Sequence, residues 1–399
     1  MPSSRRLAAV LLALALAGCT AEARPTDDVV PTGTPGDGGA LDAVADHEQL
    51  PPLESGHSVR GVVLDPDGDP VVLANQIAGD APLHLLRRDD DGGWTDTPLT
   101  DQDSLGFSAE LGVTDDGTAV VTGYADRRFS ITRVTPDGQV STVPVDADLD
   151  PDRIGTLNAT VAPAGDVVYI GYTDPPAGAS GLLAVDAATG AVRAQTSVLA
   201  ETAGPPYPAR LAVTPDGTGL LVAFNHDLDD ITGSDTTSLT RYDAALQPLG
   251  EVSLVETDSA AATWALDLTA DGTALIAVRI GDDDDAAGGS DSGMRLLSLA
   301  PGASTVTEVA SFPERYLLDD LAVDPAGEWL YLAGLQHTPL PDDDRTITVV
   351  DLRTGAVADP LLLCPGYQLG DLLVDVDDAR AVAATRCEGD GAASLWTLG

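Results

Sequence analysis

Residues 211–223 read LAVTPDGTGLLVA, and this stretch decides the fold because it recurs along the chain. Two apolar segments flank the turn Asp216-Gly217, and Asp-Gly between alternating apolar residues favours a β-hairpin. Six similar stretches occur: VVLDPDGDPVVLA from Val62, LGVTDDGTAVVTG from Leu111, TVAPAGDVVYIG from Thr160, LDLTADGTALIAV from Leu266, LAVDPAGEWLYLA from Leu321 and LLVDVDDARAVAA from Leu372. Successive turns are 48 to 55 residues apart. A period of this length indicates a repeat architecture.

Each repeat also contains two further strand-like segments, such as SLTRYD at 238–243 and LGEVSLV at 249–255 in the fourth. Four antiparallel strands in each of seven repeats predict an all-β fold, a β-propeller of seven four-stranded blades. The seventh repeat ends with 394–398 as its third strand. We expect a segment near 43–53 to supply the fourth strand, because such ring closure removes two exposed sheet edges.

Two hairpins carry a family resemblance. The segments AVDAATGAV at 184–192 and VVDLRTGAV at 349–357 resemble the YVTN-type repeats of extracytoplasmic, lactonase-like propeller proteins. The resemblance covers roughly residues 43–399 at the level of the repeat pattern. It implies a propeller of six to eight blades and says little about activity.

The N-terminal segment MPSSRRLAAVLLALALAGC has the features of an export signal. Arg5 and Arg6 precede an apolar run at 7–17, which is shorter than the ~20 residues that span a bilayer. The residues Leu16-Ala17-Gly18-Cys19 resemble the bacterial lipobox, which implies that Cys19 carries fatty acyl chains such as palmitate. An ordinary signal peptide with an incidental cysteine is the alternative.

This segment defines the domain organisation. Residues 1–18 are predicted as a lipoprotein signal peptide and 43–399 as the propeller. Residues 19–42, rich in Pro, Gly, Thr and Asp, are predicted as the lipidated cysteine and a flexible tether. This organisation predicts a protein anchored by lipid at the extracytoplasmic face of the cell membrane. We expect it to be a monomer.

Two cysteines remain besides Cys19. In an oxidising compartment the simplest arrangement is a disulfide between Cys364 and Cys387. Two free, buried thiols are the alternative.

The charge of the chain argues against anionic partners. Its 64 acidic and 20 basic residues give a net charge of -44, which should repel nucleic acid and anionic headgroups. The aspartate runs at 89–91, 282–285 and 342–344 are interpreted as solvated loops, with calcium sites as the alternative.

The repeat register predicts a candidate site at one mouth of the propeller channel. A fixed offset from a repeated turn gives the same side-chain orientation in every blade. Seven positions before each turn, five of the seven residues are polar, and they are expected to form one ring: Glu110, Asn158, Arg210, Asp320 and Asp371. The inward positions two residues further along are mostly small: Gly112, Thr160, Ala212 and Ala322.

This polar ring has two interpretations. The mouth of any water-filled channel is polar, so the ring need not bind anything. Alternatively, Glu110, Asn158, Asp320 and Asp371 converge on Ca²⁺ or another divalent cation beside Arg210, since hard ions prefer such oxygen ligands. The set resembles the Glu/Asn/Asp metal site of gluconolactonase-type propellers, which polarises the substrate carbonyl.

A second group of side chains is expected to rim the same face, in loops upstream of the inner strands: Tyr207, Trp264, Arg315, Tyr316 and Tyr367. Aromatic groups there could stack on sugars or peptides, or they could pack against neighbouring blades.

No recognisable catalytic set occurs in the sequence, and this favours a binding protein over an enzyme. The leading hypothesis is a lipid-anchored ligand-binding or protein-interaction module, with a protein, peptide or carbohydrate as ligand. The alternative is a metal-dependent, lactonase-like hydrolase that uses the channel carboxylates.

Overall fold

The computed structural model describes residues 41, 43–51, 57–76, 82–89, 92–103, 109–125, 128–147, 149, 154, 156–174, 179–198, 206–226, 236–255, 261–281, 293–312, 316–337, 343–364, 372–377, 380–387 and 393–399. The chain divides into two compact units, Met1–Thr32 and Gly33–Gly399, and every described residue belongs to the second. The predicted signal peptide, Cys19 and nearly all of the tether therefore lie outside the described residues.

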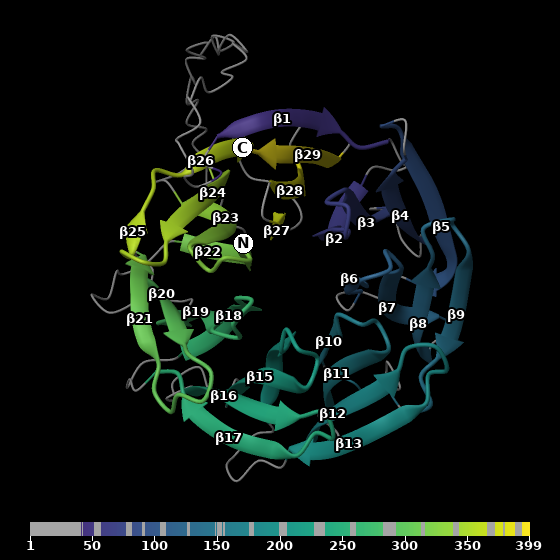
Figure 1. Ribbon diagram of the computed structural model, residues 1–399, viewed down its shortest axis with the longest axis horizontal. Coiled ribbons are helices and arrows are strands. Elements are labelled where there is room, and N and C mark those ends of the chain that lie inside the picture. Colours follow the sequence, from purple (N-terminus) through teal and green to yellow (C-terminus); the bar gives the residue numbers. More distant parts are fainter. Residues whose placement is uncertain are drawn as a thin grey trace, which may run out of the picture. The chain divides into compact units, whose positions relative to one another are not determined.

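The second unit is a β-propeller of seven four-stranded antiparallel blades arranged in a ring, as the sequence predicted (Figure 1). Blade 1 contains β2 (His57–Leu64), β3 (Pro70–Gln76), β4 (Pro82–Arg88) and β5 (Trp94–Asp103). Blade 2 contains β6 (Leu111–Val113), β7 (Ala119–Ala125), β8 (Arg128–Val134) and β9 (Val140–Pro144). Blade 3 contains β10 (Thr156–Val161), β11 (Val167–Asp174), β12 (Ala179–Asp186) and β13 (Val192–Val198). Blades 4 and 5 contain β14 (Tyr207–Val213), β15 (Gly219–His226), β16 (Thr236–Asp243) and β17 (Pro248–Ser253), and β18 (Ala261–Leu268), β19 (Ala274–Ile280), β20 (Gly293–Leu299) and β21 (Thr307–Phe312). Blade 6 contains β22 (Tyr316–Val323), β23 (Trp329–His337) and β24 (Asp343–Asp351), with its outer strand divided into β25 (Ala356–Val357) and β26 (Leu361–Cys364). Blade 7 contains β27 (Leu373–Val376), β28 (Ala381–Arg386), β29 (Ala393–Leu398) and β1 (Val44–Gln49).

The repeated turn forms because glycine tolerates a left-handed backbone. In the first blade Gly68 has φ +79° and its N–H donates to the carbonyl of Asp65 at 2.8 Å. The equivalent glycine in the next five blades also has a positive φ, between 66° and 82°. A side chain at such a position would strain the backbone, so the repeated turn glycine marks the hairpin directly.

Apolar side chains fill the interfaces between neighbouring blades. Val71 belongs to the apolar cluster between blades 1 and 2, whereas Val72, the next residue on β3, belongs to the cluster between blades 7 and 1. Because side chains alternate across a strand, each middle strand contributes apolar side chains to the interfaces on both faces of its blade. Within the described residues, one such cluster lies at each of the seven blade interfaces.

The ring closes through β1, which pairs antiparallel with β29 in blade 7 (Figure 1). The imidazole of His47 stacks on the indole of Trp396, with ring centroids 5.0 Å apart. Glu48 contacts blade 1: its carboxylate pairs with Arg88 and accepts a hydrogen bond from the indole of Trp94 at 3.3 Å. The expected closing strand is therefore confirmed, and it also contacts the neighbouring blade.

The predicted disulfide between Cys364 and Cys387 is present. Cys364 ends β26 in blade 6, and Cys387 directly follows β28 in blade 7, so the bond links adjacent blades. The buried guanidinium of Arg345 on β24 pairs with Asp319 on β22, and the same carboxylate accepts the N–H of Leu372 of blade 7 at 3.1 Å. The interface between blades 6 and 7 thus has covalent and polar links beside its apolar core.

In the described part of the chain, no helix has the length and hydropathy that crossing a bilayer requires.

We predict that Glu48→Ala lowers the free energy of unfolding by about 1 kcal/mol, because it leaves half-buried Arg88 and the Trp94 indole without their shared carboxylate. Urea unfolding followed by tryptophan fluorescence measures the change. Glu308→Ala is the control: Glu308 lies 3.8 Å from Arg295 in an exposed pair, for which we expect less than about 0.5 kcal/mol. Equal losses in the two variants would show that Glu48 has no special part in ring closure.

Candidate functional site

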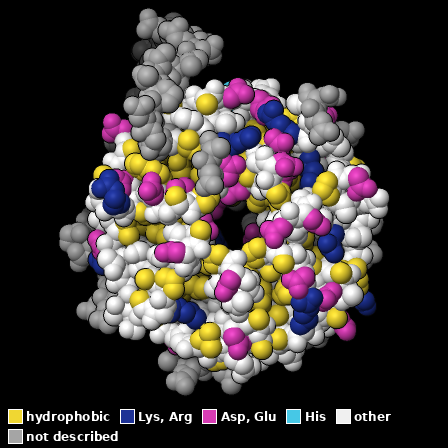
Figure 2. Space-filling model, in the orientation of Figure 1, with side chains coloured by type: hydrophobic (Ala, Val, Ile, Leu, Met, Phe, Trp, Pro, Cys, Tyr) yellow, Lys and Arg dark blue, Asp and Glu magenta, His cyan; other side chains and the backbone are white. Residues whose placement is uncertain are grey.

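A cavity of about 510 Å³ lies within the ring, between the innermost strands of five blades. Its lining consists of Thr160, Val161, Pro163, Leu211, Ala212, Val213, Pro215, Leu266, Asp267, Leu268, Ala270, Val323, Pro325, Asp375 and Val376. Most of the lining side chains are apolar, but the surface exposed to the cavity is more polar than apolar, and Asp267 and Asp375 are the carboxylates among the lining residues. Figure 2 shows an opening at the centre of the ring with acidic side chains around it.

Three carboxylates connect the innermost strands of neighbouring blades. One oxygen of Asp267 accepts the N–H of Leu268 at 2.7 Å, and the other accepts the N–H of Val323 in blade 6 at 2.9 Å. This geometry repeats at the next two interfaces. Asp320 accepts from its neighbour Leu321 and from Val374 of blade 7, at 2.9 and 3.1 Å. Asp375 accepts from Val376 and from Leu64 of blade 1, at 2.9 and 2.6 Å. We call Asp267, Asp320 and Asp375 the inter-blade aspartates.

These bonds satisfy one N–H on the free edge of the innermost strand in blades 6, 7 and 1. An innermost strand pairs with one neighbour in its own blade, so its other edge presents unpaired N–H groups. A buried N–H without an acceptor costs about as much as a lost hydrogen bond. The inter-blade aspartates supply that acceptor across the blade interface, and this gives them a structural role.

The inter-blade aspartates bind protons unusually tightly for carboxyl groups. Burial raises the pKa of Asp267 to about 6, and it raises the pKa of Asp320 and Asp375 to about 7, against the opposing effect of the backbone N–H donors. The charge of Asp267 adds to the rise at both other residues, and Arg210 on β14 partly offsets it at Asp320. The three groups therefore titrate close to neutral pH.

Two of the sequence-predicted residues, Asp320 and Asn158, bridge blades. Asp320 is an inter-blade aspartate, and Arg210 acts on it electrostatically. The amide nitrogen of Asn158 donates to the carbonyl of Pro208 in blade 4 at 2.6 Å, so this residue also bridges two innermost strands. Arg210 also donates to the carbonyl of Ala209 at 2.9 Å. At Glu110, the backbone carbonyl accepts the N–H of Thr122 at 3.0 Å.

The fifth predicted residue, Asp371, lies outside the described residues, but the register of its blade is clear. In blade 7 the hairpin closes with the N–H of Asp377 bonded to the carbonyl of Arg380, in a turn without glycine. Leu373 pairs with Ala384 as Asp320 pairs with Ala333, so Leu373, and not Asp371, takes the register position of the predicted polar ring in blade 7. The prediction is displaced by two residues because the seventh repeat has no turn glycine from which to count.

The register also explains why the sequence analysis did not identify Asp267 and Asp375 as channel residues. Asp375 occupies the position of Asp267, two residues beyond the polar column. Asp267 was detectable, because that position is small in most other blades. Asp375 was hidden by the missing turn glycine.

Among the described residues, no group of three or more His, Cys, Asp or Glu side chains is arranged to bind one metal ion. Asp371, which the metal hypothesis requires, is not among the described residues.

The predicted aromatic rim is described only in part. Trp264 lies at an irregularity in β18, packs against the apolar cluster between blades 5 and 6, and has the guanidinium of Arg279 at 5.3 Å from its ring centroid. Tyr207 begins β14 and is half-buried. Arg315, Tyr367 and the side chain of Tyr316 lie outside the described residues. Packing therefore accounts for Trp264.

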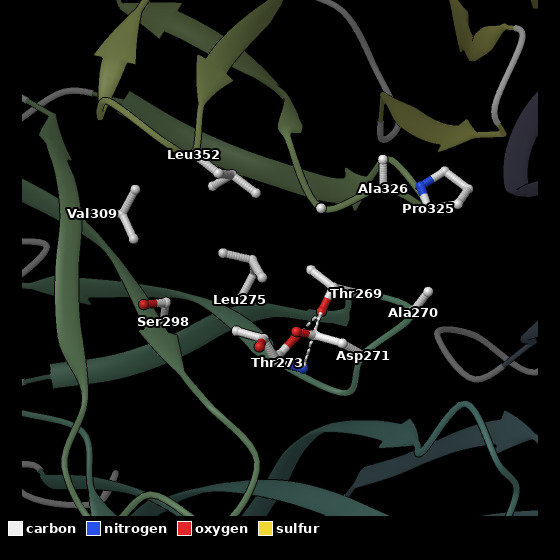
Figure 3. A pocket seen from close by; sticks show the side chains of 11 residues that line it. Thr269, Ala270, Asp271, Thr273, Leu275, Ser298, Val309, Pro325, Ala326 and Leu352 are labelled. Carbon is white, nitrogen blue, oxygen red and sulfur yellow. Dashed lines mark hydrogen bonds between the residues drawn. The ribbon is translucent and has the colours of Figure 1, made fainter.

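A second cavity, of about 440 Å³, lies between blades 5 and 6 (Figure 3). The hairpin turn of blade 5 lines one side, where Asp271 accepts hydrogen bonds from the Thr269 hydroxyl at 2.5 Å and the Thr273 N–H at 3.0 Å. Apolar groups of blade 6, Pro325 and Leu352 among them, line the other. The polar groups of Asp271 and Thr269 are already used within the turn.

Comparison with solved structures supports the fold. A streptogramin B lyase structure aligns with 89% of this chain and 98% of its own, at a TM-score of 0.55 and 13% identity. A catalytically inactive virginiamycin B lyase from Staphylococcus aureus, solved with quinupristin, aligns with 89% of this chain and 99% of its own, at a TM-score of 0.56 and 13% identity. Hydrazine synthase from Kuenenia stuttgartiensis aligns with 84% and 94%, at a TM-score of 0.55 and 15% identity. No protein-family model and no curated protein sequence matches the chain. At such identities the likeness concerns the propeller fold alone.

We predict that Arg210→Gln destabilises the protein more near pH 8 than near pH 5. The raised pKa of Asp320 means that its stabilising contribution is present at acidic pH and is lost as the pH rises toward about 7. Near pH 5 the carboxyl is neutral and gains nothing from Arg210, whereas near pH 8 its charge loses a favourable partner, at a cost of about 1 kcal/mol.

Chemical unfolding at both pH values measures this difference. Arg241→Gln serves as the control, because exposed Arg241 donates to the carbonyl of Ala300 and no inter-blade aspartate is affected by it. A loss for Arg210→Gln that is the same at both pH values would remove the link to Asp320.

Proposed function

We propose that the protein is a ligand-binding or protein-interaction propeller, anchored by lipid on Cys19 at the extracytoplasmic face of the cell membrane. The central cavity carries the binding part of this proposal. Its volume of about 510 Å³ lies within the range of small-molecule sites, and the surface of its walls is more polar than apolar, with the carboxylates of Asp267 and Asp375 among the polar groups. The lipobox-like residues Leu16 to Cys19 support the anchor.

The contacts of the cavity carboxylates favour binding over catalysis. Asp267 and Asp375 each accept two backbone N–H groups, so both oxygens are engaged by the fold. A ligand in the cavity would meet these groups as acceptors that the fold holds in place. Such an arrangement orients a ligand without requiring any group to change its partner.

A metal-dependent, lactonase-like hydrolase is the alternative function. One observation favours it: the pKa values of the inter-blade aspartates lie between about 6 and 7, which suits proton transfer at neutral pH. A lactone-hydrolysis assay with and without added Ca²⁺ separates the two functions, since metal-dependent turnover favours the hydrolase.

We predict that ligands found by a thermal-shift screen bind in the central cavity. Ala212→Phe should fill part of that cavity and weaken binding at least about tenfold, because about 1.4 kcal/mol of lost contact is enough. Ser298→Phe, which places the same side chain in the cavity between blades 5 and 6, is the control and should leave binding unchanged. Weakening by Ser298→Phe but not by Ala212→Phe would place the site elsewhere.

We predict that Cys19→Ser moves the protein from the membrane fraction to the soluble fraction or leaves the precursor unprocessed. Metabolic labelling with a fatty acid analogue should mark the wild-type chain and not this variant. The Cys364→Ala/Cys387→Ala double variant is the control, since it removes the other two cysteines and should remain labelled. An unlabelled wild-type chain would disprove the anchor.

A further inference from the structure

The central cavity lies nearer the hairpin turns than the predicted polar ring does. Pro163, Pro215 and Pro325, which belong to the turns of three blades, are among its lining residues. Arg210 and Asp320 of the polar ring stand seven residues before their turn glycines and are outside the lining. The cavity is therefore a separate part of the channel, with its own set of charged groups.

The charge of this part of the channel is negative. Among the described residues that line the cavity, Asp267 and Asp375 are ionisable, and no arginine or histidine accompanies them. Figure 2 shows further acidic side chains around the opening at the centre of the ring. A cavity whose charges all have one sign concentrates ligands of the opposite sign and repels ligands of the same sign. The cavity therefore favours a cation.

The two carboxylates keep hydrogen-bonding capacity for a ligand. Each oxygen of Asp267 accepts one backbone N–H, and each oxygen of Asp375 does the same. A carboxylate offers about four lone-pair sites, so about half of them remain for a donor in the cavity. The backbone donors also hold both groups in place and stabilise their ionised form. A ligand that donates hydrogen bonds and carries positive charge uses both properties.

An ammonium group suits this site better than a metal ion. A divalent ion such as Ca²⁺ takes about six to eight oxygen ligands. Among the described residues, no three His, Cys, Asp or Glu side chains are grouped to bind a metal. A primary ammonium has three N–H donors, and two carboxylates are enough to accept them. Hydrogen bonds between charged partners are also the stronger kind.

The remaining space fits an aliphatic body. The cavity has a volume of about 510 Å³, more than an ammonium group alone fills. Aliphatic side chains from four blades line it beside the carboxylates: Leu211, Val213, Leu266, Val323 and Val376. Contact with them removes apolar surface of a ligand from water, which favours binding.

We propose that the central cavity binds a small organic cation, whose primary ammonium group donates to the carboxylates of Asp267 and Asp375 and whose aliphatic body contacts the apolar side chains of the wall. This inference rests on the proposed ligand-binding function, and it names the chemical class of the ligand.

Three probes of equal length test the charge preference: hexylamine, 1-hexanol and hexanoate. They are titrated calorimetrically into the full-length protein at pH 8, where the amine is protonated, the alcohol neutral and hexanoate negative. We expect hexylamine to bind at least about tenfold more tightly than 1-hexanol, and hexanoate to bind more weakly than 1-hexanol. Equal or tighter binding of 1-hexanol, or no binding of hexylamine, would overturn the proposal.

Variants then assign the amine to the cavity. Ala212→Phe fills part of the cavity and leaves every charge in place, so it should weaken hexylamine binding at least about tenfold. Asp267→Asn and Asp375→Asn should each reduce the preference for hexylamine over 1-hexanol at least about threefold. Asp271→Asn removes the same charge from an exposed turn and is the matched control, which should retain the preference.

The preference is a ratio of two affinities measured on one variant, so it can be read even where that variant is less stable. Hexylamine binding that is unchanged by Ala212→Phe, or a preference lost equally in Asp271→Asn, would show attraction to the acidic surface and overturn the proposal. Neutral or anionic ligands that Ala212→Phe weakens would overturn the ammonium preference and leave the binding function in place. The binding function itself fails if no ligand of any charge is sensitive to Ala212→Phe.

Discussion

The structure depends on one packing constraint: every blade is apolar on both faces and must be covered on both. Consecutive residues such as Val71 and Val72 lie in different interfaces, so no blade can bury its middle strand alone. Only a closed ring gives each blade two neighbours. The pairing of β1 with β29 completes the ring, and the loss of that strand would leave the last blade with an exposed edge.

Ring closure creates a second constraint at the centre. Seven innermost strands meet there, and each has one edge that pairs with no strand of its own blade. Bridges from the preceding blade satisfy part of this edge, through Asp267, Asp320 and Asp375 on one side and Asn158 and Asn225 on the other. The polarity of the channel therefore follows in part from the fold, before any ligand is considered.

The fold was predictable from sequence because its signals are local. A glycine with positive φ marks the inner hairpin of six blades, and the closing strand follows from counting strands in the seventh. The incorrect parts of the sequence prediction also have local causes. The turn from Asp377 to Arg380 has no glycine, so the register of blade 7 was displaced and Asp375 was missed. The irregularity beside Trp264 left no sequence signal, because bulges depend on how strands pack.

The candidate site was less predictable because register gives a side chain's direction but not its partner. The polar column predicts that Asp320 lies at the channel, and it leaves open whether that side chain binds a ligand. The structure shows that its second oxygen accepts the N–H of Val374, more than fifty residues away, on an edge that exists only once blade 7 is in place. This partner could not be inferred from the repeat that contains Asp320. An acceptor that satisfies a strand edge is less available to a ligand. The number of acceptors left for a ligand in the channel therefore depends on how the strand edges are satisfied. That is a property of the closed ring and cannot be found in a single repeat.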